Sequence, residues 1–265
     1  MLHFYTPAMP TARQKKRRRK WLLIIMVTAG MALSGIMTLQ WLTYRRARFV
    51  RYPEFGIAIP ESYSIHGIDV SKYQSTIAWE EVKAMQVRKV KLGFAFIKAT
   101  QGEKNEDPQF ARNWKKAREA GMLRGAYHFF IPSGDGTTQA RNFIQHVTLE
   151  EGDLPPVLDI EQLNGISVTQ LKREVKEWLA VAEEHYGVKP LIYTNVDFYN
   201  RFLGDEFDAY PLWIAHYYQQ QQPRIQRGWL FWQHSDQGQV NGIAAHVDFN
   251  VFNGDSAEFR NMLMR

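Results

Sequence analysis

Short apolar runs alternate with helical patterns from His66 onward, and this alternation limits the possible folds more than any other feature of the sequence. The runs are rich in β-branched and aromatic residues, which favour strands. They lie at 66–70, 92–99, 124–130, 154–161, 190–195, 211–217, 229–235 and 246–250. The segments between the earlier runs have apolar residues at helical spacing, at 79–85, 108–120, 137–149 and 168–186.

Strands that alternate with helices predict parallel βαβ units, and eight of them indicate a closed barrel. The last gaps, at 217–229 and 235–246, hold only about ten residues each, which is too short for a regular crossover helix. We therefore predict an α/β fold, namely an irregular, flattened TIM-like barrel with helices missing on the C-terminal side. Loops would join the last strands, some of which can run antiparallel.

An uncharged apolar segment at 21–42 precedes this body. At about 1.5 Å per residue it is long enough to cross a hydrocarbon core of roughly 30 Å. Trp21 and Trp41 lie at its ends, as interfacial anchors do. We predict one transmembrane signal-anchor helix. A cleaved signal peptide is the alternative, although the run is longer than a typical signal core and lacks a clear small-residue cleavage site.

The basic residues are concentrated at the N-terminus. Residues 1–51 hold eleven Lys and Arg and no acid, and subtracting them from the net charge of +6 leaves −5 for residues 52–265. An acidic body is a poor match for nucleic acid, so no nucleic-acid partner is expected. Seven of the basic residues lie in 13–20 and four in 45–51, which favours a cytoplasmic N-terminus and an exported body.

The stretch LPPVLDIEQ at 154–162 ends an apolar run on two acids, Asp159 and Glu161. Residues two apart in a strand point to the same face, so the two side chains should project together, with Cα atoms about 6.6 Å apart. Desolvation and mutual repulsion would raise their pKa values and could keep one acid protonated near neutrality. General-acid cleavage of a glycosidic bond requires such a pair.

Other predicted strand ends carry compatible groups. Asp69 ends the first strand and Asp248 lies in the last, so three strand ends offer carboxylates. Amide, imidazole and phenol groups lie at further ends, a mixture suited to a sugar: Tyr127, His128, Tyr193, His216, Tyr217 and Gln233.

Two other interpretations of the acids stay open. They could pair with Lys or Arg, or together bind a hard cation through oxygen ligands. The sequence has no D-x-D-x-D-G loop or H-E-x-x-H pattern, and it has no cysteine for a thiolate site. We expect no metal and no other cofactor.

Ordered motifs across the body resemble glycoside hydrolase family 25, the lysozymes of the Chalaropsis type. They are GIDVSKYQ (67–74), FAFIKATQG (94–102), GAYHFF (125–130), PPVLDIEQ (155–162), LIYTN (191–195), LWIAHY (212–217), FWQHS (231–235) and VDFNVF (247–252). The resemblance implies an irregular α/β barrel that hydrolyses the β-1,4 bond between N-acetylmuramic acid and N-acetylglucosamine in peptidoglycan.

The resemblance also implies roles for the acids. Glu161 would be the general acid, Asp159 would stabilise the neighbouring N-acetyl group or the cationic transition state, and Asp69 and Asp248 would complete the acidic cluster. Tyr127, Tyr193, Trp213 and Tyr217 would contact sugar, unless they are barrel-lining core residues. Including the polar strand-end residues, we expect the substrate to be bound by Tyr127, His128, Tyr193, Trp213, Tyr217 and Gln233.

The expected layout is a basic cytoplasmic tail (1–20), the transmembrane helix (21–42), a linker (43–62) and the catalytic domain (63–265). The protein would be a single-pass protein of a bacterial inner membrane, with its catalytic domain in the periplasm and glycan strands of peptidoglycan as its partner. The sequence leaves the oligomeric state open.

The predicted site favours one mechanism and leaves two rival functions open. Same-face acids favour retention assisted by the substrate's N-acetyl group over a carboxylate-linked intermediate. A catalytically silent peptidoglycan-binding module is the alternative function. A chitinase-like hydrolase fits less well, because residues 154–157 lack the further acids of that signature.

Overall fold

The computed structural model describes residues 12–44, 48–219 and 221–265. The chain divides into two compact units, residues 1–46 and residues 47–265.

The first unit contains one long helix, α1 (Ala12–Tyr44). Its segment Arg19–Leu39 has a mean hydropathy of 2.2 and none of it is buried within the protein. Length and composition therefore suit a membrane span, as predicted for 21–42, although a signal sequence has the same properties. Of the predicted basic tail, residues 12–20 are helical and residues 1–11 lie outside the described part of the chain.

The expected linker at 43–62 is instead largely folded. Strands β1 (Phe49–Tyr52) and β2 (Ile57–Pro60) form an antiparallel hairpin around the short 3-10 helix η1 (Pro53–Phe55). Tyr52, Phe55 and Ile59 are fully buried and belong to the main hydrophobic core. The backbone carbonyl of Phe55 also accepts a hydrogen bond from Gln239 N–H. The globular domain therefore begins near residue 48 rather than at residue 63.

Eight strands close into a barrel, as the sequence predicted. The strands follow one another around it in the order β3, β12, β11, β10, β9, β8, β7 and β5, and β5 pairs back with β3. Their bounds are β3 (His66–Val70), β5 (Val90–Gln101), β7 (Leu123–Phe129), β8 (Val157–Asp159), β9 (Leu191–Asn195), β10 (Leu212–Ala215), β11 (Phe231–Gly238) and β12 (Val247–Phe252).

The barrel is irregular on its C-terminal side. Strand β12 runs antiparallel to both of its neighbours, β11 and β3, whereas the other neighbouring barrel strands are parallel. No helix lies among the described residues between β10 and β11, or between β11 and β12. The predicted absence of helices on this side is thus confirmed. Two short strands outside the barrel, β4 (Gln86–Val87) and β6 (Asn105–Glu106), pair with β5.

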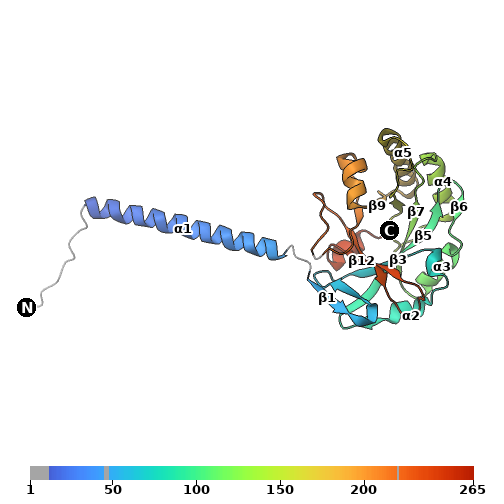
Figure 1. Ribbon diagram of the computed structural model, residues 1–265, viewed down its shortest axis with the longest axis horizontal. Helices are drawn as coiled ribbons and strands as arrows, with labels where there is room; N and C mark the ends of the chain where they lie inside the picture. The colour runs from blue at the N-terminus through green and yellow to red at the C-terminus, as the bar shows by residue number, and fades with distance from the viewer. Residues whose placement is uncertain (1–11, 45–47, 220) are drawn as a thin grey trace, which may run out of the picture. The chain divides into compact units, whose positions relative to one another are not determined.

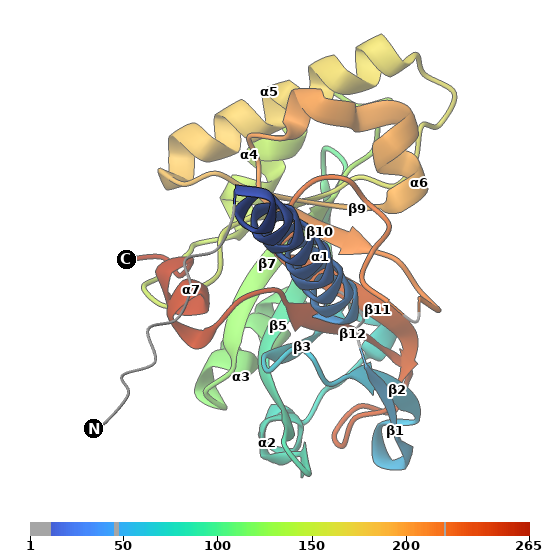
Figure 2. The same ribbon diagram turned by 90° about the vertical axis from the view of Figure 1, so that its left-hand side faces the viewer.

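Helices cover the outside of the remaining strands (Figure 1). Figure 2 shows α5 beside the segment of α6 and η3, which follows β9. Gly187, in the left-handed region, ends α5 at the residue that the sequence predicted. The helices are η2 (Lys72–Gln74), α2 (Trp79–Ala84), α3 (Phe110–Glu119), α4 (Gly136–His146), α5 (Val168–Tyr186), α6 (Val196–Phe198), η3 (Tyr199–Leu203), η4 (Gly204–Phe207) and α7 (Ser256–Asn261).

Aromatic rings fill the barrel interior. Phe96 stacks on Trp213 with ring centroids 4.4 Å apart, and Phe94 packs edge-to-face against Phe96. Two inward glycines make room for these rings: a Cβ added to Gly67 would lie 2.5 Å from the Phe94 ring, and one added to Gly125 would lie 2.6 Å from the Phe96 ring. The barrel is therefore a packed core, and chemistry is confined to its ends.

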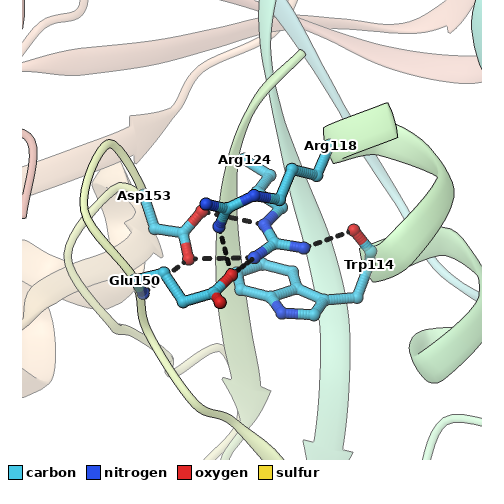
Figure 3. Close-up of polar contacts among 5 residues, drawn as sticks. All are labelled: Trp114, Arg118, Arg124, Glu150 and Asp153. Atoms are coloured by element: carbon cyan, nitrogen blue, oxygen red, sulfur yellow. Dashed lines mark hydrogen bonds and ion pairs between the residues drawn. The ribbon is translucent and has the colours of Figure 1, made fainter. Parts of the chain in front are cut away.

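A charged network lies outside the barrel, near the amino end of β7. Figure 3 shows Arg124, at the start of β7, between Trp114 of α3 and the loop that carries Glu150 and Asp153. Its guanidinium donates to both Asp153 oxygens, at 2.8 and 3.2 Å, to Glu150 at 2.8 Å and to the Trp114 carbonyl at 2.6 Å. Arg118 also pairs with Glu150.

Candidate active site

The four predicted acids meet at the carboxyl end of the barrel. Asp69 lies on β3 directly opposite Asp248 on β12, Asp159 ends β8, and Glu161 follows two residues later. Their charges act on one another, since the pKa of Asp69 is raised by Glu161 and that of Asp159 is raised by Glu161, Asp69 and Asp248. Among the described residues, none of the four makes an ion pair with Lys or Arg within 4.0 Å.

Asp69 and Asp248 share a proton. Burial raises the pKa of Asp248 to about 9, reinforced by the charge and the hydrogen bond of Asp69. Burial raises the pKa of Asp69 to about 6, against hydrogen bonds from Asn250, Gln233 and Asp248. At neutral pH Asp248 is thus the protonated partner and Asp69 the carboxylate that accepts its hydrogen bond.

Asp159 and Glu161 form the second pair. Burial raises the pKa of Asp159 well above its usual range, and the charge of Glu161 adds to the rise. Burial also raises the pKa of Glu161, while Tyr193 and Lys98 oppose that rise. Asp159 is only 6% exposed, and its Oδ1 has no hydrogen-bond partner in the described protein. Glu161 is half-buried, so it is the acid that an incoming substrate can reach more easily.

A hydrogen-bond network holds Asp69 in place. Its Oδ2 accepts from Gln233 Nε2 at 2.8 Å and from Asn250 Nδ2 at 2.7 Å. The Gln233 carbonyl oxygen in turn accepts from the hydroxyls of Tyr193, at 2.7 Å, and Tyr217. Since both Gln233 groups are engaged and the residue is 2% exposed, Gln233 orients the acids rather than presenting an amide to solvent.

The tyrosines border the acids. Tyr127 is half-buried on β7, and its pKa is raised by burial and by the charges of Asp69, Asp159 and Asp248. Tyr193 lies within hydrogen-bonding reach of Glu161 as well as Gln233. When Glu161 is protonated, it can donate to the Tyr193 oxygen while the phenol donates to Gln233.

His128 is not part of this cluster, which corrects the expectation that it binds substrate. Consecutive strand residues face opposite ways, so Tyr127 faces inward and His128 outward. The imidazole is fully buried, hydrogen bonded to Thr100 at 2.7 Å and to Gln139 at 3.2 Å, and stacked on Trp178. Burial lowers its pKa to about 3, so it is a neutral core residue.

Trp213 points inward but lies deeper in the barrel than the acids. It is 1% exposed, stacked on Phe96, and its indole N–H donates to Asn250 at 2.8 Å. With so little accessible surface it cannot stack on a sugar. Its role is to position Asn250, which holds Asp69.

A cavity of about 380 Å³ lies at the carboxyl ends of β9 and β10. Asn195, Asp197, Asn200, His216 and Tyr217 are among its lining residues. Tyr217 also bonds Gln233 of the acid cluster, so the cavity adjoins the site. Polar amide, carboxylate and imidazole groups beside an aromatic ring suit a carbohydrate ligand.

The comparisons with known proteins agree with this geometry. Residues 68–243 match the family model described as glycosyl hydrolases family 25. The chain belongs to this family. It is 50% identical over 206 residues to YegX of Escherichia coli strain K12, described as uncharacterized, covering 78% of this chain and 76% of that protein. It is 34% identical to Lysozyme M1 of Streptomyces globisporus, covering 77% and 73% respectively.

A solved structure supports the same assignment. The family 25 glycosyl hydrolase from Bacillus anthracis superposes with a TM-score of 0.71 at 33% identity, over 81% of this chain and 100% of that chain. This family 25 protein is therefore a glycoside hydrolase, as its sequence motifs indicated.

The family 25 site includes residues that sequence reasoning missed. Lys98 lies inward on β5, two residues beyond Phe96, and its charge acts on both Asp159 and Glu161. Lys98 continues the alternation of the inward residues Phe94 and Phe96, so the sequence already indicated that this lysine points into the barrel. Asn250 and Asp236 also act on the aspartates, Asn250 by hydrogen bond and Asp236 through its charge on Asp248.

A second acidic group in the described chain lies apart from these four acids. Oxygens of Asp135, Glu174 and Glu177, at α4 and α5, are within 4.8 Å of one another and could hold a cation. Glu174 already accepts from Gly136 N–H at 2.9 Å and pairs with Arg173, while Asp135 caps α4. These contacts explain the cluster without an ion.

Proposed function

We propose that this family 25 enzyme is a muramidase that hydrolyses the β-1,4 bond between N-acetylmuramic acid and N-acetylglucosamine in peptidoglycan. The observation that carries the proposal is the desolvated pair of Asp159 and Glu161, of which one acid is buried and the other accessible. Such a pair keeps a proton available near neutral pH. The name of the Streptomyces relative, a lysozyme, supports the same substrate class.

In this proposal Glu161 is the general acid. It is the more exposed of the two, so its proton can reach the oxygen of the leaving sugar. Burial alone favours the proton on Asp159 in the free enzyme. Asp159 Oδ1 has no hydrogen-bond partner in the described protein, so it can accept a hydrogen bond from an acetamido N–H of the substrate. This bond would stabilise the Asp159 carboxylate and leave the proton on Glu161.

The proposed reaction is retaining and substrate-assisted. The acetamido oxygen bonds to C1 as the C1–O4 bond breaks, and O4 takes the Glu161 proton. Asp159 stabilises the resulting oxazolinium by accepting a hydrogen bond from its N–H. Water then adds to C1 and gives a proton to Glu161, which restores the acid and the original anomeric configuration. Two acids two residues apart in one chain segment favour this route, because they would approach the sugar from the same side.

Asp69 and Asp248 tune this pair. The Asp69 carboxylate is held by hydrogen bonds from Gln233 and Asn250. Its negative charge lies beside Asp159 and favours retention of the proton that Asp159 and Glu161 share. Tyr127, Tyr193 and Tyr217 are the proposed sugar-contacting side chains, with the cavity beside Tyr217 accommodating the adjoining residue of the glycan strand.

We further propose that α1 anchors the enzyme in the inner membrane of a bacterium, with the catalytic domain in the periplasm. The apolar segment and the excess of Lys and Arg on its N-terminal side support this orientation. Tethering would confine cleavage to wall near the membrane, which suits local remodelling as well as lysis.

A zymogram of purified peptidoglycan tests the proposed function. The wild type should clear the gel, Glu161→Gln should not, and Glu119→Gln, an exposed change on α3, should clear as the wild type does. Mass spectrometry should find new reducing ends at N-acetylmuramic acid, with no cleavage of chitin. Equal clearing by Glu161→Gln would overturn the assigned acid, and no clearing by the wild type would favour a silent wall-binding module.

A further inference from the structure

Lys98 is the charged residue of the barrel interior that the proposed mechanism has not used. Its side chain follows Phe94 and Phe96 on the inward face of β5, at the end of the barrel where the acids lie. It is half-buried, and burial lowers its pKa. A lysine placed against a packed aromatic core loses hydration, so its position calls for a compensating partner.

Strand register places the ammonium group at the level of Asp159. Lys98 pairs with Tyr127 on β7, and Phe129, two residues further along β7, pairs with Asp159 on β8. Lys98 Nζ lies 4.5 Å from the centre of the Phe129 ring. The side chain therefore extends towards the carboxyl end of the barrel, to the level that Asp159 occupies.

The charges around Lys98 are unequal. Asp159 is the strongest of the groups that act on its ammonium, followed by Asp107, then by the like charge of Lys72, and last by Glu161. Asp107 is already engaged by the backbone N–H groups of Lys72 and Gln109, both at 2.9 Å. The charge of Lys98 thus favours a carboxylate on Asp159 more than one on Glu161.

We propose that Lys98 is a positioning residue for the acid–base pair: its charge acts together with the bound substrate's acetamido N–H to stabilise a carboxylate on Asp159, so that the proton is left on Glu161. This inference rests on the proposed muramidase function. Without the charge of Lys98, the charges of Glu161 and Asp69 would act on Asp159 unopposed by it, and Asp159 would keep the proton that Glu161 must donate. Lys98 touches neither the leaving oxygen nor the proton, and its charge acts more strongly on Asp159 than on Glu161.

A purely structural role for Lys98 makes a different prediction. Nζ donates to Gln101 Oε1 at 2.8 Å, and this bond together with the Phe129 contact could simply fix the end of β5. Loss of such a role would lower stability and total activity but would leave the pH dependence in place. The position of the pH profile therefore separates the two roles.

The test compares charge-removing and charge-keeping variants of the full chain in detergent. Lys98→Gln removes the charge but can still hydrogen bond to Gln101, Lys98→Met removes both, and Lys98→Arg keeps the charge. Lys91→Met, on the exposed face at the other end of β5, is the matched control. The readout is kcat/KM against pH on soluble glycan fragments of peptidoglycan.

We expect Lys98→Gln and Lys98→Met to move the acidic limb of the profile to higher pH by about one unit, since Asp159 would ionise less readily. Lys98→Arg and Lys91→Met should leave it in place. An unmoved acidic limb in Lys98→Gln, with lower activity or not, would overturn the inference. An active Glu161→Gln would instead overturn the proposed function, so the two failures are distinguishable.

Discussion

Asp69 and Asp248 lie directly opposite one another on the antiparallel strands β3 and β12, and their carboxyl groups share a hydrogen bond. A buried acid and a half-buried acid in this arrangement do not both ionise readily near neutral pH, because like charges in a desolvated site repel strongly. The antiparallel β12, the strand that departs from regular barrel topology, is thus the element that brings the second aspartate to the site.

The shared proton makes stability depend on pH. Folding raises the pKa of Asp248 to about 9, so the folded protein keeps a proton that the unfolded chain releases above about pH 4. The free energy of unfolding should therefore fall as pH rises from about 4 to about 9. Asp248→Asn keeps a donor to Asp69 and has no proton to lose. We expect it to stabilise the domain by about 2 kcal/mol at pH 7.

The measurement is thermal unfolding by near-UV circular dichroism at pH 4 and pH 7. The gain from Asp248→Asn should be present at pH 7 and small at pH 4, where the folded wild type is protonated and the unfolded chain is still about half protonated. Asp205→Asn, an exposed change on η4, should show no gain at either pH. An equal gain for Asp248→Asn at both pH values would contradict the shared-proton account.

Much of the barrel was predictable because its strands are buried on both faces. Fully apolar runs bounded by turns gave strand positions within a few residues, with β3 (66–70) matched at both ends. The same reasoning placed Asp69, Asp159 and Glu161, since carboxyl ends of parallel barrel strands meet at one face. Asp248 lies near the amino end of β12 and reaches that face because β12 is antiparallel. Gaps of about ten residues correctly indicated missing helices after β10 and β11.

The errors have physical causes of two kinds. The hairpin at 49–60 was expected to be a linker because its strands have only four residues each, and their burial comes from tertiary packing that local patterns do not reveal. His128 was assigned from its place near a predicted strand end, and Trp213 from its position in a family motif, with a core role as the alternative. Strand parity excludes the first, and depth within the barrel, set by the register of β10 against β9, excludes the second.

The N-terminal boundary gives a second prediction. Removal of residues 1–47 should leave a soluble domain with wild-type activity, because the hairpin remains. Removal of residues 1–62 would delete Tyr52, Phe55 and Ile59 from the core and expose Phe249, whose ring packs 5.4 Å from that of Phe55. At about 1.5–3 kcal/mol for each buried side chain, this loss should unfold the domain or lower its stability by about 5 kcal/mol.

Comparing the two truncations by expression in the soluble fraction and by melting temperature checks this prediction. Each lacks the apolar helix, so the membrane segment cannot account for a difference between them. If the shorter fragment, beginning at residue 63, proves as stable and active as the longer one, the hairpin is not part of the folded core.

A third prediction concerns the close approach inside the barrel. Gly125→Ala would place a Cβ 2.6 Å from the Phe96 ring, so the ring must move or the strands must separate. We expect a loss of about 1–3 kcal/mol. Because Phe96 stacks on Trp213, which supports Asn250 and Asp69, kcat should also fall.

Gly228→Ala is the control, since nothing lies within 4 Å of its added Cβ. Phe96→Leu in the Gly125→Ala background should recover part of the stability by relieving the overlap. Failure of this second change to restore any stability would show that the lost stability has another origin. Unfolding in denaturant at constant pH provides the measurement.

The charged network at the opposite end of the barrel supplies the fourth prediction. Arg124 and Asp153 are both almost fully buried, with side chains 3% and 4% exposed. The Arg124 guanidinium donates a hydrogen bond to each of the two Asp153 carboxylate oxygens. Arg124→Met should cost about 3–5 kcal/mol, because it leaves Asp153 as an unpaired buried charge. Arg118→Met breaks an exposed pair to Glu150 and should cost less than about 1 kcal/mol.

The double variant Arg124→Met/Asp153→Asn tests the cause, since removal of the second charge should recover part of the loss. If Arg124→Met and Arg118→Met destabilise the domain equally, burial is not what makes the Arg124 pair important. Residual folded Arg124→Met protein should keep the wild-type pH profile of cleavage, because Arg124 lies at the amino end of β7 and the acids lie at the opposite end of the barrel. Loss of the Arg124 network should thus lower stability without changing the titration of the catalytic acids.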